Sequence, residues 1–195
     1  MGRILAWIAS VLAGAGLGLV SAWAAISFGQ SSFSEHYGAW AFNRAAGSVA
    51  ADPYTRAIVA RYGLLALSAR ETVYFTLSTD ERGQPLDESC VYELAGRAFD
   101  ARWWSVTLYA NDSYLARNDD HAGSVDATRV HLGADGVWRA RIAPVQGDAI
   151  YWLSSRSARR GFSVTLRVYN PGPDFAPSAE ALPVLRTISC PGGAA

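Results

Sequence analysis

Residues able to act in catalysis or to bind a metal are few in this chain. Of its three histidines, His36 lies in the expected linker, His131 lies on an expected strand, and His121 has two acidic neighbours in a polar loop. Those neighbours are Asp119 and Asp120, and imidazole and carboxylate groups are common metal ligands and general acids or bases. Three such groups in one polar loop are more often simply solvated, and His131 is expected at the surface. The sequence therefore predicts no metal site and no cofactor.

No motif for nucleophilic catalysis is present either. A reactive Ser or Cys needs a base and an orienting acid, but the chain has no Gly-x-Ser-x-Gly, and Ser105 falls in the middle of an expected strand. An enzyme would need a site assembled from distant residues such as Asp119, His121 and Arg167. A carbohydrate-active or hydrolytic enzyme of that kind is the alternative to a binding protein.

The charge balance argues against nucleic acid as a partner. Lys and Arg number 17 and Asp and Glu also 17, so the formal net charge is zero. Nucleic-acid binding depends on a basic surface. The one basic run, at 156–160, is expected to be a solvated loop.

The segment 102–109 has the clearest strand pattern in the chain. Its aromatic and β-branched residues alternate between two faces, and turn-forming residues follow at 111–113. Trp104, Val106 and Leu108 form the expected core face. Trp103 and Tyr109 lie on the opposite face, which is expected to be partly wet.

The segment 162–169 has the same alternation, and it adds Arg167 and Tyr169 to the face opposite its core residues. Aromatic rings beside an arginine are typical of a platform that stacks on a sugar or contacts a protein. The candidate binding residues are therefore Trp103, Tyr109, Arg167 and Tyr169. A one-residue error in register would instead make these rings part of the core, so buried packing stays open as the alternative.

The remaining pattern indicates a mainly β domain. Asp52-Pro53 is typical of a helix start, and apolar residues at helical spacing predict one flanking helix over about 53–67. Short strands separated by turns then predict an antiparallel β-sandwich or jelly-roll-like domain. Besides 102–109 and 162–169, the expected strands are 71–78, 90–94, 125–132, 136–142, 149–153 and 185–190, with a hairpin turn at 133–136.

The N-terminus indicates an exported protein. No charged residue occurs from Ile4 to Phe28, and about 25 apolar residues at about 1.5 Å each exceed a bilayer core of about 30 Å. Arg3 precedes this run, so the positive-inside rule places the N-terminus in the cytoplasm. The predicted location is a single-pass anchor in the inner membrane, with residues 4–28 in the lipid bilayer and the domain in the periplasm.

A cleaved signal peptide is the rival interpretation of this segment, because Ala22-Trp23-Ala24 matches a cleavage site. The apolar run is longer than that of a usual signal peptide, which favours an uncleaved anchor. The expected organisation is an N-terminal transmembrane anchor at 1–28, a linker at 29–51 and a β domain at 52–195.

Cys90 and Cys190 are the only cysteines. An even number in an oxidising compartment favours a disulfide, which would join the C-terminal tail to an early strand. Two free thiols are the alternative, and a metal site would need two further ligands that no nearby histidine provides.

Two motifs give the chain a family resemblance. Arg102-Trp103-Trp104-Ser105-Val106-Thr107-Leu108-Tyr109 and the later stretch Leu166-Arg167-Val168-Tyr169-Asn170-Pro171 resemble the domain-of-unknown-function family 1214. Tyr92 and Gly96 match an earlier part of the family pattern. Family members often carry Asn-Trp-Leu-Pro before the last long strand, where this chain has Tyr151-Trp152-Leu153-Ser154.

The resemblance covers about residues 52–190 and implies a jelly-roll-like β domain. It also implies a companion protein of family 1254, fused or separate, and it implies no established activity. Together with the anchor, it favours a membrane-anchored envelope β domain that acts as a binding or accessory module with a companion protein.

Overall fold

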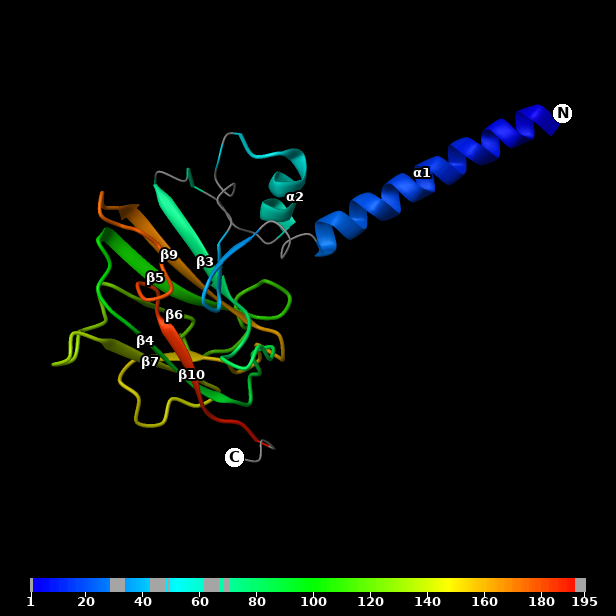
Figure 1. Cartoon of the computed structure of the whole chain (residues 1–195). Helices are drawn as coiled ribbons and strands as arrows, with labels where there is room; N and C mark the ends of the chain where they lie inside the picture. Colours follow the sequence, from blue (N-terminus) through cyan, green and yellow to red (C-terminus); the bar gives the residue numbers. More distant parts are fainter. Residues whose placement is uncertain are drawn as a thin grey trace.

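The computed structural model describes residues 2–28, 34–42, 48, 50–61, 67–68 and 71–191. Within these residues the chain is mainly β, with two sheets, a long N-terminal helix and a short second helix (Figure 1). The predicted fold class is confirmed. The β domain lies at one end of the long helix, which projects away from it.

The larger sheet has six strands in the order β1-β2-β3-β9-β5-β6, and every pair in it is antiparallel. Strand β9 lies between β3 and β5 and pairs with β5 over eight positions from Ala101 to Tyr109, so the two motif strands are direct neighbours. The bounds are β1 Glu35–Tyr37, β2 Trp40–Phe42, β3 Thr72–Leu77, β5 Ala101–Tyr109, β6 Ser124–Asp126 and β9 Ser163–Pro171.

The smaller sheet has four strands in the order β10-β4-β7-β8. Its pairs are antiparallel except for β7 and β8, which run parallel over three positions. The bounds are β4 Val91–Gly96, β7 Trp138–Ala143, β8 Trp152–Ser154 and β10 Val184–Ser189.

The core lies between the two sheets. Trp104 from β5 stacks on Trp138 from β7, with ring centroids 4.8 Å apart, which joins the two sheets through large apolar surfaces. Val164, Leu166 and Val168 of β9 are 0% exposed, as their alternation predicts. Burial of such side chains contributes about 1.5–3 kcal/mol each, so this layer supplies much of the driving force for folding.

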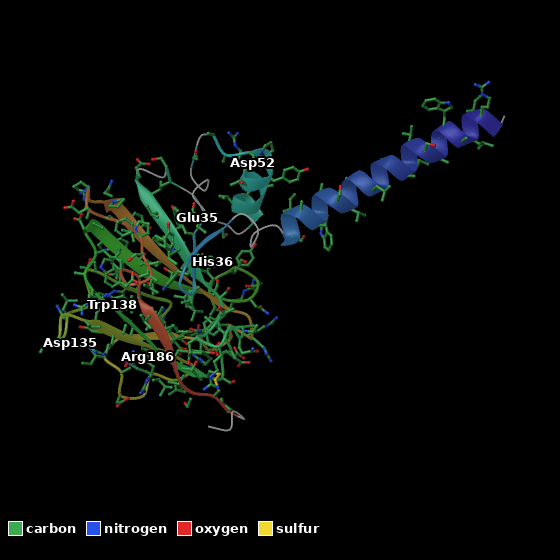
Figure 2. All side chains as sticks on the ribbon, in the orientation of Figure 1. Glu35, His36, Asp52, Asp135, Trp138 and Arg186 are labelled. Carbon is green, nitrogen blue, oxygen red and sulfur yellow. A yellow bond between two sulfur atoms is a disulfide. The ribbon has the colours of Figure 1, made fainter. Side chains whose placement is uncertain are left out.

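The predicted disulfide is present. Cys90 and Cys190 are bonded across a sequence separation of 100 residues, and the yellow bond near the C-terminus marks them (Figure 2). The bond links the start of β4 to the end of β10, because Ser189 pairs with Val91 in the register of these two strands.

Helix α1, Gly2–Phe28, is long and apolar enough to cross a membrane, and its segment Gly2–Ser27 is not buried by the rest of the chain. Helix α2, Pro53–Arg61, begins at the predicted position. The Asp52 carboxylate caps it by accepting hydrogen bonds from the N–H groups of Tyr54 and Thr55, at 2.9 and 3.1 Å. Residues 62–66, to which the prediction extended this helix, lie outside the described residues.

The structure corrects the predicted linker. Strands β1 and β2 fall inside residues 29–51, and β2 pairs with β3, so the six-stranded sheet begins before residue 52. Trp40 is 2% exposed and donates a hydrogen bond to the carbonyl of Pro183 at 2.6 Å. Gly38, with φ of 63°, takes the left-handed conformation in the turn between the two strands.

The predicted strand at 125–132 and its hairpin with 136–142 are also corrected. Strand β6 ends at Asp126 and belongs to the six-stranded sheet, whereas β7 belongs to the other. The turn itself is present, with the Gly133 N–H bonded to the Val137 carbonyl at 2.9 Å. This turn lies in the loop that connects the two sheets. The loop begins after β6, where the Asp126 carboxylate accepts hydrogen bonds from the backbone N–H groups of Thr128 and Arg129 and the chain turns away from β5.

Candidate functional site

The four predicted binding residues lie together on the outer face of the six-stranded sheet. Trp103 and Tyr109 come from β5, and Arg167 and Tyr169 come from β9, each half-buried. Tyr74 of β3 is the cross-strand partner of Arg167 and joins them. These five residues are called the aromatic face below.

Trp103 and Tyr169 form one end of this face. They are directly opposite each other in the β5–β9 register, and their ring centroids are 5.2 Å apart. The Trp103 indole N–H donates to the Thr128 hydroxyl at 2.9 Å, which fixes the orientation of the ring. The pair therefore presents a rigid aromatic surface.

Arg167 occupies the centre of the face between two tyrosines. Its guanidinium carbon lies 5.9 Å from the ring centroid of Tyr74 and 5.4 Å from that of Tyr109, within cation–π range. It also donates hydrogen bonds to the Tyr109 hydroxyl and, at 3.3 Å, to the Thr107 hydroxyl. The guanidinium is held in place by neutral groups.

Arg167 has no acidic partner. The described residues include all 17 Asp and Glu side chains, and the ion pairs among them involve other arginines. The nearest carboxylate in its row of the sheet is Asp126, opposite Ser105 on β6, and that group pairs with Arg129 at 2.6 Å. The positive charge of Arg167 is thus uncompensated on a half-buried surface.

Two hydroxyls of largely buried residues lie next to this charge. Ser105 is the cross-strand partner of Arg167, and Thr165 is the partner of Thr107, so the four side chains share two adjacent rows of one face. Ser105 is 6% exposed and Thr165 is 3% exposed. Neither hydroxyl makes a hydrogen bond with any residue that the structure describes, and both oxygens keep contact with solvent, because Thr72 Oγ1 is the one buried side-chain polar atom without a partner among these residues.

The loop that carries Asp119, Asp120 and His121 is held to a neighbouring loop by hydrogen bonds of Asp120. Asp120 accepts hydrogen bonds from the Ser154 hydroxyl at 2.6 Å and from the Arg156 Nε at 2.9 Å. The Arg156 hydrogen bond, with a smaller contribution from Ser154, holds the pKa of Asp120 below its ordinary value. The acidic loop is therefore tied to the loop that follows β8.

The alternative enzyme site would draw on Asp119, His121 and Arg167. In the described part of the chain, no hydrogen bond or ion pair joins Asp119 or His121 to Arg167. No group of three metal-ligating side chains occurs among these residues either. His131 is exposed, and its backbone N–H donates to the Tyr151 hydroxyl at 3.0 Å.

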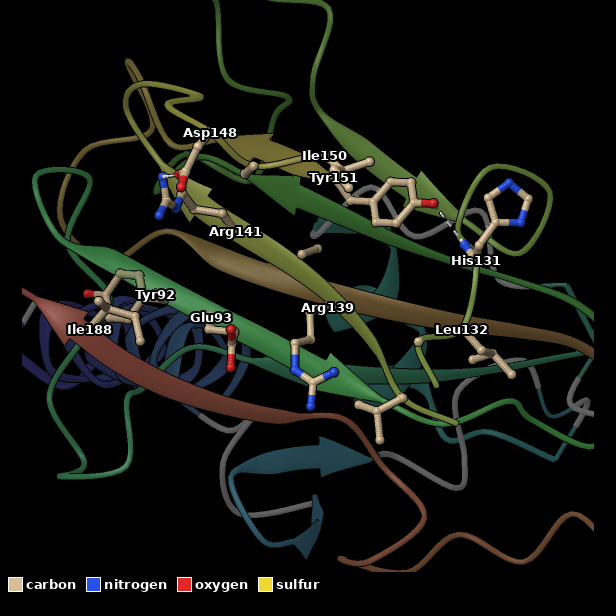
Figure 3. Close-up of a pocket in the computed structure, with 14 residues that line it drawn as sticks. Tyr92, Glu93, His131, Leu132, Arg139, Arg141, Asp148, Ile150, Tyr151 and Ile188 are labelled. Carbon is tan, nitrogen blue, oxygen red and sulfur yellow. Dashed lines mark hydrogen bonds and ion pairs between the residues drawn. The ribbon is translucent and has the colours of Figure 1, made fainter. Parts of the chain in front are cut away.

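A second candidate surface lies on the outer face of the four-stranded sheet. It is an open groove with a volume of about 680 Å³. Figure 3 shows Glu93 on β4 and Arg139 and Arg141 on β7 along its floor, with Tyr151 and His131 at one end. This surface is called the arginine groove below.

The floor of the arginine groove carries a row of alternating charges. Glu93 lies opposite Arg186 of β10 on one side and opposite Arg141 of β7 on the other. Arg141 also pairs with Asp148 at 2.8 Å. Opposite charges on neighbouring strands stabilise a sheet, and here they leave no large net charge in the groove.

The rim of the arginine groove is aliphatic. Leu132, Ile150 and Ile188 line it with exposed fractions of 50%, 84% and 59%. Val184, 52% exposed, lines an adjoining groove over the same sheet. Sequence analysis missed this surface because its residues come from three strands and two loops, and each is unremarkable in its own segment.

Fold and surfaces together define a two-sheet β domain with two candidate binding surfaces. The family described as "Protein of unknown function (DUF1214)" matches residues 71–173, more than half of the 195-residue chain. The chain belongs to this family, which confirms the resemblance noted in its motif strands.

Two solved structures are similar to this chain. The VPA0106 protein from Vibrio parahaemolyticus is 22% identical with a TM-score of 0.56, and the similarity covers 72% of this chain and 36% of that one. An uncharacterized protein from Burkholderia cenocepacia is 17% identical with a TM-score of 0.46, over 60% of this chain and 29% of that one. The chain thus spans about a third of the length of these proteins. No curated protein matches it.

Proposed function

We propose that this chain is a membrane-anchored module of the bacterial envelope that binds a companion protein through the arginine groove. In this proposal residues 1–28 form the anchor, and the β domain, including the β1–β2 hairpin, holds the companion at the membrane surface. The domain has no catalytic role of its own.

The anchor is supported by the length and composition of α1. Its 26-residue segment from Gly2 to Ser27 spans about 39 Å at about 1.5 Å per residue, enough for a bilayer core of about 30 Å with some tilt. The only charged side chain in this helix is Arg3, which favours a cytoplasmic N-terminus. We therefore propose a single-pass protein of the inner membrane with its domain in the periplasm.

The disulfide supports the same location. Bonds of this kind form and persist in oxidising compartments such as the periplasm and are rare in the cytosol. Cys90 is 5% exposed and belongs to the core cluster, against which the partly buried Cys190 packs, so the bond is part of the folded domain.

The observation that carries the partner proposal is the aliphatic rim of the arginine groove. Ile150 and Ile188 expose most of their surface to solvent on the same side of the domain. Burying them in an interface would gain about 25 cal/mol per Å² of apolar area. Clustered exposed aliphatics of this kind mark interaction sites.

The charges of the groove favour a protein over other occupants. The row Arg186–Glu93–Arg141 is balanced once Asp148, the ion-pair partner of Arg141, is included, so it offers paired hydrogen-bonding groups without the strong positive field that nucleic acid or anionic lipid requires. An apolar rim around arginines is typical of a protein interface. The greater length of the solved relatives also supports a companion, since in them a domain of this fold is part of a longer chain.

Site-specific photo-crosslinking in the native membrane tests the proposal. A photoreactive phenylalanine derivative replaces Ile150 in the full-length chain, and Tyr114, which is 67% exposed on a loop outside the groove, is replaced as the control position. We expect one defined protein adduct from position 150, lost when Ile188→Asp is added, and none from position 114. Equal adducts from both positions, or adducts with lipid alone, would contradict a protein-binding groove.

A further inference from the structure

We propose that the aromatic face is a binding site for an anionic sugar, a polyhydroxylated ring that carries a carboxylate or phosphate group. The proposal does not depend on a companion protein, because this face belongs to the other sheet from the arginine groove. It rests on three features of the same face: an uncompensated arginine, two hydroxyls without a protein partner among the described residues, and fixed aromatic rings.

Arg167 supplies recognition of the anionic group. A guanidinium has five N–H donors in a planar fork. Among the described residues, Arg167 donates hydrogen bonds only to the hydroxyls of Thr107 and Tyr109. Further donors are thus available, and a guanidinium binds carboxylate and phosphate oxygens with two parallel hydrogen bonds. The contacts with the Tyr74 and Tyr109 rings hold its plane in place before a ligand arrives.

Ser105 and Thr165 supply partners for ligand hydroxyls. Both are more than nine-tenths buried, and neither has a hydrogen-bond partner among the described residues. Their hydroxyl oxygens keep contact with solvent, so a ligand hydroxyl can take the place of water there. The β5–β9 register places Ser105 beside Arg167 and Thr165 in the next row, so the three groups are neighbours on one face of the sheet.

Trp103 and Tyr169 supply a surface for the ring. They lie one row from Arg167 and Ser105, and their rings contact each other at 5.2 Å. The C–H faces of a sugar pack on aromatic rings, whose polar ends stay hydrogen-bonded. Anion, hydroxyl and ring contacts thus occur within three adjacent rows of one sheet.

Ligand-observed saturation-transfer NMR of the full-length protein in nanodiscs tests this inference, with glucuronate, glucose 6-phosphate and glucose as probes. We expect at least one of the two anionic sugars to bind about tenfold or more tightly than glucose, because a hydrogen bond to a charged group contributes about that factor. The stronger of the two anions identifies the acidic group. Equal binding of all three probes, or binding of none, overturns the proposal.

Three variants separate a binding role from a structural one. Arg167→Gln should weaken the anionic sugar about tenfold, whereas Arg102→Gln, which removes an exposed arginine from the opposite side of β5, should leave it unchanged. Thr165→Val keeps the shape of a side chain that has no protein partner, so thermal stability should not fall while the affinity drops several-fold. The site would be refuted if the Thr165→Val protein bound the anionic sugar as tightly as the wild type, while the Arg167→Gln protein either kept its affinity or failed to fold.

Discussion

Removing the disulfide should lower the stability of the domain by several kilocalories per mole. The bond closes a loop of 100 residues, for which the chain-entropy model gives about 4.7 kcal/mol, while measured values are typically about 2–4 kcal/mol. We expect a loss of about 3 kcal/mol in the double variant Cys90→Ala/Cys190→Ala. For a domain of this size that corresponds to a fall in Tm of about 6–12 °C.

The structure explains why little else would replace the bond. Strand β10 is an edge strand with a single neighbour, β4, and alternate residues of it face solvent. Beyond that pairing it is held by buried Leu185 and by the Glu81 carboxylate, which accepts hydrogen bonds from Thr187. The cost of removing the bond arises mainly in the unfolded chain, which gains the entropy of a loop of this length.

The assay is urea unfolding of the full-length protein in a mild detergent, followed by tryptophan fluorescence. Each single variant should lose as much as the double variant, because either substitution opens the same bond, and the wild type under dithiothreitol should match them. Stability within about 0.5 kcal/mol of the wild type in the double variant would refute the reasoning.

Three further outcomes are expected. Thr72 is 1% exposed with its hydroxyl unpaired, so Thr72→Val should raise the free energy of unfolding by about 1 kcal/mol in the same urea assay, whereas a loss would show that the hydroxyl is satisfied. The Arg139 hydrogen bond lowers the pKa of Asp135 from 3.8 to about 2, so the stability that this carboxylate contributes is complete above about pH 3.8 and lost as the pH falls through 2. Arg139→Gln should move that pKa back toward 3.8 in a carbon-13 carboxyl titration, and Arg141→Gln should not. Alkaline carbonate should leave the chain in the membrane fraction with residues 1–28 intact by mass, and a chain that starts near Ala25 would show signal cleavage.

The core faces were predictable from alternation alone. In β5 and β9 one set of alternate residues is aliphatic or aromatic without a polar atom to satisfy, and that set is buried, as for Val106 and Leu166. The same alternation placed Trp103, Tyr109, Arg167 and Tyr169 on the opposite face. Their binding role stays a prediction. Alternation placed each of them on the outer face of its strand, and the pairing of β5 with β9 brings them together there.

The grouping around Arg167 was not predictable, because it depends on which strands pair and in which register. Tyr74 comes from a strand about 90 residues earlier, and only the β3–β9 register places it opposite Arg167. Parity within 71–78 did indicate that Tyr74 faces outward. No local pattern showed which residue of another strand would lie beside Tyr74.

Short elements were missed for a different reason. Strands β1 and β2 have three residues each, too few to show alternation, and Trp40 is buried through a contact with Pro183 that is distant in sequence. Gly38 between them was the available signal, since glycine as the first residue of a two-residue turn favours a hairpin. The predicted β6–β7 hairpin was wrong because a local turn signal does not determine whether the flanking segments enter the same sheet.

The anchor joins the β domain next to β1, the edge strand of the six-stranded sheet. Seven peptide units separate Phe28 from Glu35, so β1 lies within about 25 Å of the end of α1. Because β1 is the edge of the six-stranded sheet, the tether attaches at a side of the sandwich, whereas the aromatic face and the arginine groove lie on its two outer faces, which point away from each other. A companion in the groove and a ligand on the aromatic face can then be bound together. Ile188 and Arg167 lie on different sheets, so we expect each of Ile188→Asp and Arg167→Gln to weaken its own interaction and leave the other within experimental error. Loss of sugar binding in Ile188→Asp would place the two interactions on one surface and contradict this arrangement.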